Sequence, residues 1–298
     1  MKAAALLEEA AAALRAAGVD AAEWDAERLL GHALGRDRAF LLAHPETDVA
    51  GEPLARFREL LAERARRVPL QHLLGTQAFW RHEFLVTPDV LVPRPETELL
   101  VEAALERLRP TREPLVVDVG TGSGCLALSI AAERSDARVH ATEVSRPALA
   151  VAHENARRLG LVGRVRFQEG DLLAPVAALA GSFDVVVSNP PYVAETERAS
   201  LAPEVRDHEP AIALFASEGG LGVYRRLVPA AHEALRPGGH LVLELGAGQS
   251  AAVDTLCTAA GLAVVELRPD LQGIERALVA RRPELSAPGA LASNGSLA

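Results

Sequence analysis

A regular alternation of short apolar strands and helical segments runs through the larger, second part of this chain. From Leu115 onward, seven segments rich in Val and Leu have the length of strands, and most are separated by a helical stretch. These segments are 115–120, 138–143, 164–168, 183–189, 240–246, 262–267 and 275–280. Their apolar residues are continuous, which is typical of strands buried on both faces. The pattern predicts an α/β fold with a seven-stranded, mostly parallel, doubly wound sheet and helices on each side.

The beginning of the chain has a helical period instead. In residues 1–75, apolar side chains recur at three- and four-residue spacing, and breaks fall at Gly18, Gly35 and Pro45. Glu8 and Glu9 interrupt the apolar start, so we expect an amphipathic helix there instead of a leader, and a cytoplasmic protein. This region is predicted to be a small all-helical domain.

A strand-like pattern follows the helical region. Between Phe79 and Val92, aromatic and β-branched residues around Thr87-Pro88-Asp89 predict a β-hairpin, and a helix should begin at Glu96. The Ser-, Gly-, Pro- and Ala-rich end of the chain has no periodicity and is predicted to be disordered. The predicted organisation is therefore a helical domain (1–75), a hairpin linker (76–95), an α/β domain (96–282) and a disordered tail (283–298).

Charge and composition exclude several classes of protein. The chain has 298 residues with 40 acids and 31 bases, and residues 86–282 carry 26 acids and 20 bases, a net charge of −6. This is not the basic surface that binding to a nucleic-acid backbone usually requires. No stretch approaches the ~18–20 apolar residues of a membrane-spanning helix. The two cysteines lie far apart without a CxxC motif, and the nine histidines show no HxH or HExxH spacing, so we expect no disulfide and no metal.

A glycine-rich turn follows the first predicted strand. Gly120-Thr121-Gly122-Ser123-Gly124 leads directly into a helical stretch, so the backbone can turn tightly and present N–H donors of a helix start to a ligand. Dinucleotide-binding folds use a similar turn, and a tight turn without a ligand is a further alternative. The turn alone does not identify a ligand.

Acidic residues lie at the ends of three consecutive strands. Asp118 precedes the glycine turn, Glu143 ends the second strand, and Asp171 follows the third. A carboxylate at the position of Glu143 can accept hydrogen bonds from both hydroxyls of a ribose, while Asp171 can accept from an adenine amino group and Leu172 can cover the ring. Singly, such acids are more often caps or surface residues. Together with the glycine turn, they indicate an adenosyl ligand.

The fourth strand ends in Asn189-Pro190-Pro191-Tyr192. Two prolines cannot continue a central strand, so the chain must turn outward at the carboxyl edge, where open α/β sheets bind ligands. The Asn189 side-chain oxygen and the Pro190 carbonyl can accept both hydrogens of a planar NH₂ group, and the Tyr192 ring can stack on its plane. This turn therefore predicts a site for an amino group.

In this order, residues 120–124, Glu143, Asp171 and 189–192 resemble the motifs of seven-stranded S-adenosylmethionine-dependent methyltransferases. The Asn-Pro-Pro-Tyr turn resembles their amino-methylating subgroup, which includes DNA adenine-N6 and cytosine-N4, rRNA guanine-N2 and glutamine-N5 enzymes. The turn alone leaves base and glutamine open as methyl acceptors.

Sequence outside the turn favours glutamine. Residues 69–105, with the run Pro-Arg-Pro-Glu-Thr-Glu, and residues 219–249 and 270–281 resemble the HemK/PrmC family of release factor glutamine methyltransferases. Glu143 stands where that family more often has Asp, and Asp-His-Glu-Pro at 207–210 replaces a more usual Tyr-Glu-Pro. The resemblance covers nearly the whole chain up to about Arg282.

The resemblance implies a methyl transfer from S-adenosylmethionine, which leaves as S-adenosylhomocysteine, to the N5 atom of the glutamine in the Gly-Gly-Gln motif of class I peptide chain release factors. It implies that the helical domain recognises this protein partner. The implied catalytic residues are Asn189, Pro190 and Tyr192, and these with Pro191 would bind the substrate. The implied cofactor-binding residues are Asp118, Gly120, Thr121, Gly122, Ser123, Gly124, Glu143, Asp171, Leu172 and Asn189.

Two other functions stay open at this point. A nucleic-acid amino-methyltransferase acting on adenine N6 or guanine N2 would use the same turn, although the net charge of −6 and the lack of a recognition insert disfavour it. A non-catalytic adenosyl-binding or scaffold protein is the third alternative. We expect a monomer that binds neither nucleic acid nor a membrane.

Overall fold

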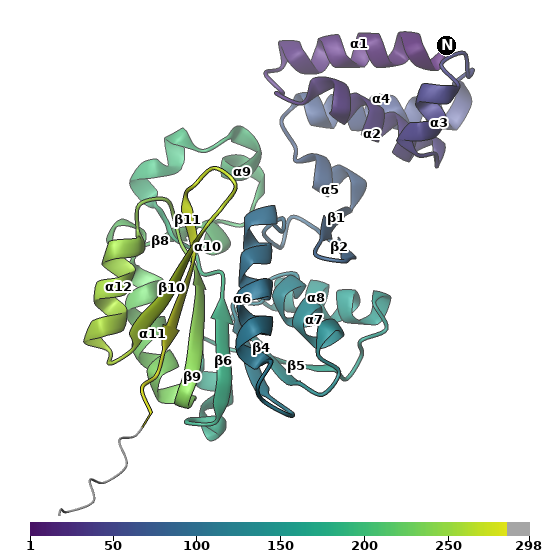
Figure 1. Ribbon diagram of the computed structural model, residues 1–298. Helices are drawn as coiled ribbons and strands as arrows, with labels where there is room; N and C mark the ends of the chain where they lie inside the picture. The colour runs from purple at the N-terminus through teal and green to yellow at the C-terminus, as the bar shows by residue number, and fades with distance from the viewer. Residues whose placement is uncertain (285–298) are drawn as a thin grey trace, which may run out of the picture.

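The computed structural model describes residues 1–284 and shows a helical N-terminal part, a short hairpin and a large α/β part (Figure 1). From residue 285 on, the predicted tail lies outside the described residues. Across the described part, no helix combines the length and the apolar character that crossing a membrane requires.

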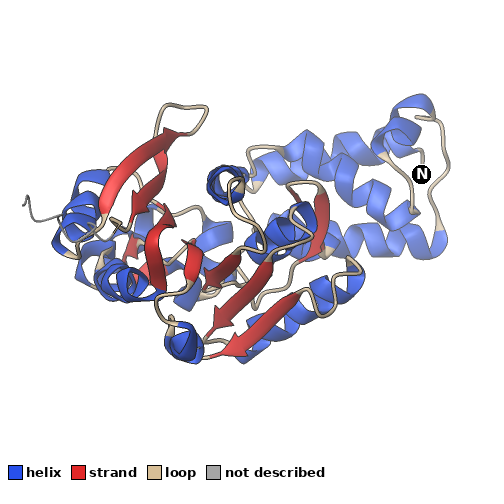
Figure 2. Ribbon diagram, turned by 60° about the horizontal axis from the view of Figure 1, so that its bottom comes forward, coloured by secondary structure: helices blue, strands red, loops and turns tan. Residues whose placement is uncertain are grey.

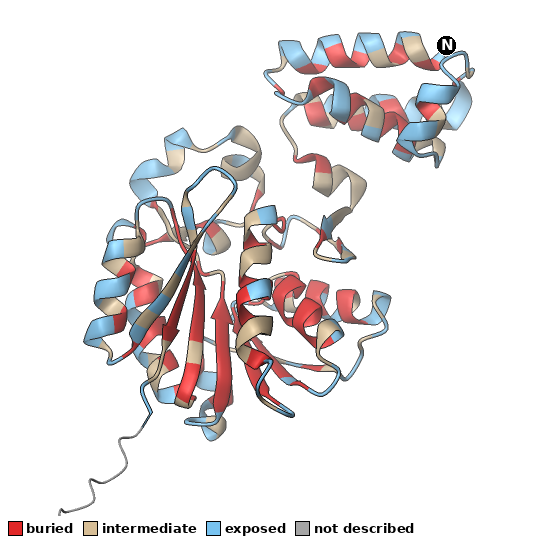
Figure 3. Ribbon diagram, viewed as in Figure 1, coloured by how far each residue is buried: buried red, intermediate tan, exposed pale blue. Residues whose placement is uncertain are grey.

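The N-terminal helices enclose a core of their own. They are α1 (Ala3–Ala16), α2 (Ala22–Leu34), α3 (Arg38–Ala43), α4 (Gly51–Ala65) and α5 (Leu70–Leu74). Leu14, Leu29, Leu30 and Phe57 are at most 1% exposed and pack together between the helices. Figure 3 shows the buried side of each long helix turned toward the others. The five helices confirm the predicted helical region. The apolar spacing in the sequence corresponds to the face of each helix that is buried in this core.

A two-stranded hairpin connects the helices to the sheet. Strands β1 (Thr76–Phe79) and β2 (His82–Leu85) pair antiparallel, and the chain reverses at Trp80, whose φ is 55°. The prediction of a hairpin around Thr87-Pro88-Asp89 was therefore wrong in its position. Pro88 has no N–H to donate to a strand ladder, so the chain after β2 forms a loop instead.

The central sheet has seven strands in the order β10-β11-β9-β6-β3-β4-β5. β11 runs antiparallel to its two neighbours, and the other pairings are parallel. The strands are β3 (Leu115–Val119), β4 (Arg138–Glu143), β5 (Val165–Glu169), β6 (Phe183–Ser188), β9 (Leu235–Glu244), β10 (Ala263–Pro269) and β11 (Glu275–Arg281). Each overlaps one predicted strand, so the seven-stranded doubly wound sheet is confirmed.

Helices cover both faces of this sheet (Figure 2). One face packs against α6 (Glu98–Leu108), α7 (Cys125–Glu133) and α8 (Arg146–Arg158), and the other against α11 (Gly222–Ala234) and α12 (Ser250–Ala259). Phe79 and Phe84 of the hairpin are buried in the first of these two cores. The hairpin is thus packed against the central sheet as well as joined to it.

Short elements lie between β6 and α11, beyond the carboxyl edge of the sheet. They are β7 (Val193–Ala194), η3 (Glu195–Ser200), α9 (Pro203–His208), α10 (Ala211–Leu214), β8 (Phe215–Ala216) and η4 (Glu218–Gly220), and β7 pairs with β8. Residues 193–216 are called the cover segment below. A further short helix, η2 (Ala174–Leu179), follows β5, and η1 (Pro95–Thr97) precedes α6.

Candidate active site

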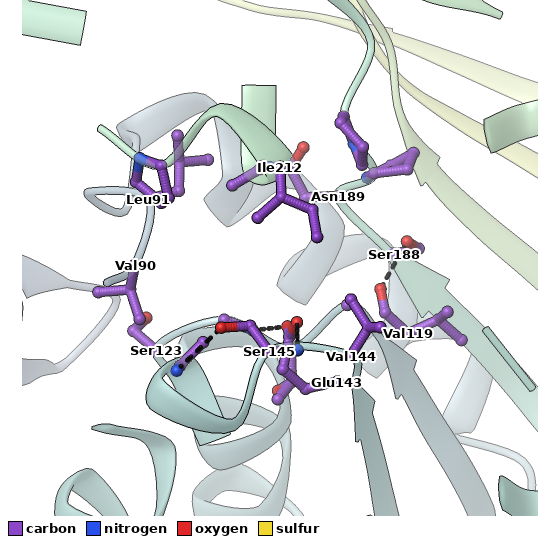
Figure 4. Close-up of a pocket in the computed structure, with 18 of the residues that line it drawn as sticks. Val90, Leu91, Val119, Ser123, Glu143, Val144, Ser145, Ser188, Asn189 and Ile212 are labelled. Carbon is purple, nitrogen blue, oxygen red and sulfur yellow. Dashed lines mark hydrogen bonds between the residues drawn. The ribbon is translucent and has the colours of Figure 1, made fainter. Parts of the chain in front are cut away.

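A cavity of about 350 Å³ lies at the carboxyl edge of the sheet. This volume falls in the range of small-molecule sites, ~300–1,000 Å³. Figure 4 shows Asn189 and Ile212 on the opposite side of the cavity from Glu143 and Ser145. Of the predicted site residues, the cavity is lined by Gly120, Thr121, Gly122, Ser123, Glu143, Asp171, Leu172, Asn189, Pro190 and Pro191.

The glycine turn forms one wall. Gly122 has a φ of 54° and Gly124 one of 83°, a left-handed region that side chains rarely adopt. A Cβ on Gly124 would lie 3.0 Å from Cδ1 of Leu128 and 3.3 Å from Cβ of Ala152. Gly124 therefore allows the start of α7 to pack closely on α8, although it does not itself line the cavity.

Asp118 lies beneath the turn and outside the lining of the cavity. Its Oδ2 accepts hydrogen bonds from Thr121 Oγ1 at 2.6 Å and from the backbone N–H of Ala127 at 3.2 Å. The side chain is fully buried, and burial raises the pKa of Asp118 to about 7 against the effect of these hydrogen bonds. Its contacts join the glycine turn to α7.

Glu143 ends β4 and faces the glycine turn. Its two oxygens accept from the backbone N–H of Gly122 at 3.0 Å and of Ser145 at 2.9 Å. A carboxylate has about four acceptor positions, so each oxygen retains one after these bonds. The backbone bonds fix the carboxylate at the wall of the cavity.

Asp171 and Leu172 lie at the third strand end. Asp171 forms an ion pair with Arg226 of α11, and both side chains are more than half exposed. Leu172 has a φ of 47°, an unfavourable value for a leucine. Such strain persists where the surrounding structure imposes it, and here Leu172 lines the cavity.

The Asn-Pro-Pro-Tyr turn leaves β6 at the opposite wall. Ser188 donates to the carbonyl of Val119 at 2.7 Å and holds the end of β6 to β3. The Asn189 Nδ2 donates to Thr97 Oγ1 at 3.2 Å, and Tyr192 donates its hydroxyl to Glu244 Oε1 at 3.1 Å. Tyr192 is half-buried against the core and is not among the residues that line the cavity.

Four groups of lining residues lie away from the predicted motifs. They are Asp89, Val90, Leu91 and Pro93 of the linker, Thr97 of η1, Pro210, Ile212, Ala213 and Phe215 of the cover segment, and Val223 and Arg226 of α11. Thr97 lies inside the Pro-Arg-Pro-Glu-Thr-Glu run, which was the available signal for it. The cover segment has no periodic pattern that would place it over the cavity.

Two acids hold the cover segment over the site. Glu209 is 7% exposed, pairs with Arg94 and accepts from the backbone N–H of Val92 at 3.4 Å. Glu204 pairs with Arg64 and Arg67 of the N-terminal part. The linker and the helical region thus both hold the cover segment in place through ion pairs.

Family models match two parts of the chain. Residues 5–75 match the PrmC N-terminal domain, and residues 95–206 match the methyltransferase small domain. The release factor glutamine methyltransferase of Cereibacter sphaeroides is 47% identical over 283 residues, which cover 95% of this chain and 99% of that protein. The protein of the same description from Moorella thermoacetica is 45% identical over 93% of this chain and 98% of its own.

The chain belongs to the release factor glutamine methyltransferase family. The resemblance to the HemK/PrmC family is thereby confirmed, and S-adenosylmethionine is the cofactor of this methyltransferase. Among solved structures, the hMettl16 catalytic domain in complex with a MAT2A 3′UTR hairpin has a TM-score of 0.55 at 18% identity, covering 74% of this chain and 81% of that one. At this identity, the similarity shows only that the two proteins share a fold.

The cavity residues fit this cofactor. The glycine turn and Glu143 line one wall and Asp171 and Leu172 another, which suits a ligand with a ribose and an adenine ring. Within residues 1–284, no group of three or more His, Cys, Asp or Glu side chains is placed to hold a metal ion.

Proposed function

We propose that this enzyme transfers a methyl group from S-adenosylmethionine to the side-chain amide nitrogen of the glutamine in the Gly-Gly-Gln motif of class I peptide chain release factors. The observation that carries the proposal is the placement of Asn189 and Pro190 in one cavity with the glycine turn and Glu143, in a chain with full-length relatives of this family.

The chemistry requires help because an amide nitrogen is a poor nucleophile. Its lone pair is delocalised into the carbonyl group, so the enzyme must orient the nitrogen and tolerate the positive charge that it acquires. Bound S-adenosylmethionine supplies an electrophilic methyl group and leaves as S-adenosylhomocysteine. The nitrogen forms the new N–C bond as the methyl–sulfur bond breaks, and its surplus proton is released to solvent.

Asn189 and Pro190 are the proposed orienting residues. The Asn189 Oδ1 and the Pro190 carbonyl accept the two N–H bonds of the substrate amide and turn its lone pair toward the methyl group. Tyr192 follows them in the turn without lining the cavity, and its ring is proposed to stabilise the developing cation once the substrate is bound. The bond from its hydroxyl to Glu244 holds the ring in one orientation at the end of the turn.

The other cavity residues are proposed to hold the cofactor. Glu143 accepts from the ribose hydroxyls, and Asp171 and Leu172 contact the adenine. The glycine turn, residues 120–124, brings its backbone against the ligand. Asp118 supports the glycine turn indirectly, by accepting a hydrogen bond from Thr121.

The helical region 1–75 is proposed to recognise the release factor, with residues 76–95 as the linker and 96–282 as the catalytic domain. The acidic surplus of residues 86–282, 26 acids against 20 bases, supports a protein substrate over a nucleic acid. We further expect the enzyme to act as a monomer in the cytoplasm, where release factors are found.

The test compares three substrates with cofactor labelled on its methyl group. Release factor, DNA and rRNA are incubated separately with the enzyme and with its Asn189→Ala variant. We expect label on the release factor, dependent on Asn189. Label on DNA or rRNA with none on the release factor would support the nucleic-acid alternative and overturn the proposal.

A further inference from the structure

A buried chain of hydrogen bonds lies behind the Asn-Pro-Pro-Tyr turn. Glu244, the last residue of β9, accepts from Thr97 Oγ1 at 2.5 Å through Oε2 and from the Tyr192 hydroxyl at 3.1 Å through Oε1. Thr97 Oγ1 in turn accepts from Asn189 Nδ2 at 3.2 Å. Glu244 and Thr97 are each 2% exposed, so water does not compete for these bonds.

The fold places these residues together. β6 and β9 are parallel neighbours in which Ser188 pairs with Leu243, so Asn189 and Glu244 occupy the next positions at the same edge. The fully buried Tyr224 donates its hydroxyl to the backbone carbonyl of Glu244 at 2.7 Å and fixes that strand end. Thr97 comes from η1, at the start of the catalytic part.

The direction of each bond follows from the chemistry of Glu244. An ionised carboxylate accepts hydrogen bonds and donates none, so the single hydroxyl proton of Thr97 must point toward it. The Thr97 oxygen then offers lone pairs to Asn189, which must present its Nδ2. Both Glu244 oxygens lie at acceptor positions for these two hydroxyls. Burial and the charge of Glu96 raise the pKa of Glu244, whereas the hydrogen bonds from Thr97 and Tyr192 and the charge of Arg276 lower it.

We propose that Thr97 and Glu244 are positioning residues that fix the Asn189 side-chain amide with Nδ2 turned away and Oδ1 toward the methyl acceptor, so that the site accepts an amide and rejects a carboxylate. The proposal rests on the proposed function for the identity of the acceptor. It assigns to both residues a role that acts through Asn189.

The selection against a carboxylate has a simple physical basis. With Asn189 held in this direction, its Oδ1 and the Pro190 carbonyl are both acceptors. An amide NH₂ group satisfies both, whereas a glutamate side chain would place its own charged acceptors against them. A reversed Asn189 would present Nδ2 instead, and this donor would favour the carboxylate.

The experiment compares Thr97→Val with Thr97→Ser. Valine has a similar shape but lacks the hydroxyl, and serine keeps the hydroxyl. We expect Thr97→Val to lower kcat by about 100-fold, the order of effect seen when a precisely placed polar group is lost. Thr97→Ser should retain kcat within about threefold, and calorimetry should give an unchanged Kd for S-adenosylmethionine in both variants.

A binding measurement supplies a readout that a purely structural role would not move. The probe is a release factor in which the target glutamine is replaced by glutamate, titrated calorimetrically into each enzyme. The quantity compared is the ratio of the Kd for the glutamate form to the Kd for the glutamine form. We expect this ratio to be about tenfold lower in Thr97→Val than in the wild type, and unchanged in Thr97→Ser.

Several outcomes overturn the inference. It is wrong if Thr97→Val retains kcat within about twofold, if Thr97→Ser loses as much activity as Thr97→Val, or if the preference for glutamine over glutamate is unchanged. If Thr97→Val does not fold, Glu244→Gln decides, with an expected loss of about tenfold in kcat and an overturning result within twofold. Failure of the wild type to label any release factor would instead count against the proposed function.

Discussion

Arg67 and Glu204 form a bidentate ion pair between the helical region and the cover segment. Arg67 Nε and Nη2 lie 2.6 and 2.7 Å from the two carboxylate oxygens of Glu204. Arg64, 6% exposed, adds a bond of 2.8 Å to the same carboxylate and another of 2.7 Å to Asp25. Because the cover segment also lines the cavity, this pair links the proposed recognition domain to the active site.

Replacing Glu204 by glutamine should loosen that link. The two guanidinium groups lose a shared counter-charge in a largely buried setting, so we expect the free energy of unfolding to fall by about 2 kcal/mol. Hydrogen exchange within residues 195–214 should also become faster. Glu195→Gln, which breaks an exposed pair with Arg198 in the same segment, is the control and should change neither quantity measurably.

Asp118 should make stability depend on pH in an unusual direction. Its pKa is raised by burial from 3.8 to about 7, so between these values the folded state holds a proton that the unfolded state has released. The stability contributed by this group is therefore fully present below about pH 4 and is lost as the pH rises through about 7. Asp118→Asn keeps an acceptor for Thr121 and Ala127 but cannot ionise.

We expect the melting temperature of Asp118→Asn, relative to wild type, to rise steadily from pH 4 to pH 8 by scanning calorimetry. A constant difference across this range would show that Asp118 is ionised in the folded protein throughout, against the effect of its burial.

Glu143 allows a sharp test of the cofactor site. Glu143→Gln replaces one acceptor oxygen by a donor next to the backbone N–H of Gly122 or Ser145. We expect the Kd for S-adenosylmethionine, measured calorimetrically, to rise by tenfold or more, since one lost charge-assisted bond costs about 1.5–3 kcal/mol.

The control for Glu143 lies on the adjacent strand. Glu169 pairs with Glu143 in the sheet register but is exposed and bonded to Arg146. Glu169→Gln should leave the Kd for the cofactor unchanged. If both substitutions raised the Kd for the cofactor equally, the result would contradict the proposal that Glu143 binds the ribose.

Asn155 is expected to be important for stability. It is fully buried in α8, accepts from the backbone N–H of Leu85 at 2.7 Å, and donates to the carbonyls of Leu85 at 3.0 Å and Ser123 at 2.8 Å. It thus ties the hairpin to the glycine turn. Asn155→Ala should lower the free energy of unfolding by about 3 kcal/mol, because it leaves buried backbone groups without partners.

Denaturant titration measures this loss. Glu154→Ala is the matched control in the same helix, since it removes only surface ion pairs with Arg157 and Arg158, which contribute little to stability. A loss no larger for Asn155→Ala than for Glu154→Ala would contradict the structural role of Asn155.

The sheet and the glycine turn could be predicted because local sequence determines them. Strands such as Phe183–Ser188 are buried along their whole length, and this leaves a continuous apolar run in the sequence. Likewise, Gly122 and Gly124 adopt backbone angles that select glycine directly. The helical spacing of residues 1–75 reflects a single apolar face in each helix.

Contacts between distant segments could not be predicted in this way. The hydrogen bond from Thr97 to Glu244 joins residues 147 positions apart and depends on the order of strands in the sheet. Asp118 looked like a ligand because it precedes the glycine turn, but the pleat of β3 directs it into the core. The hairpin reverses at Trp80, where no glycine, asparagine or aspartate marks a turn.

The central claim is that the acceptor is the side-chain nitrogen of one glutamine in a release factor. Tandem mass spectrometry of a release factor incubated with the enzyme and S-adenosylmethionine tests it most directly. The account predicts a single added methyl group on the glutamine of the Gly-Gly-Gln motif, absent when Asn189→Ala replaces the wild type. A methyl group on another residue, or an unmodified factor in the presence of active enzyme, would contradict it.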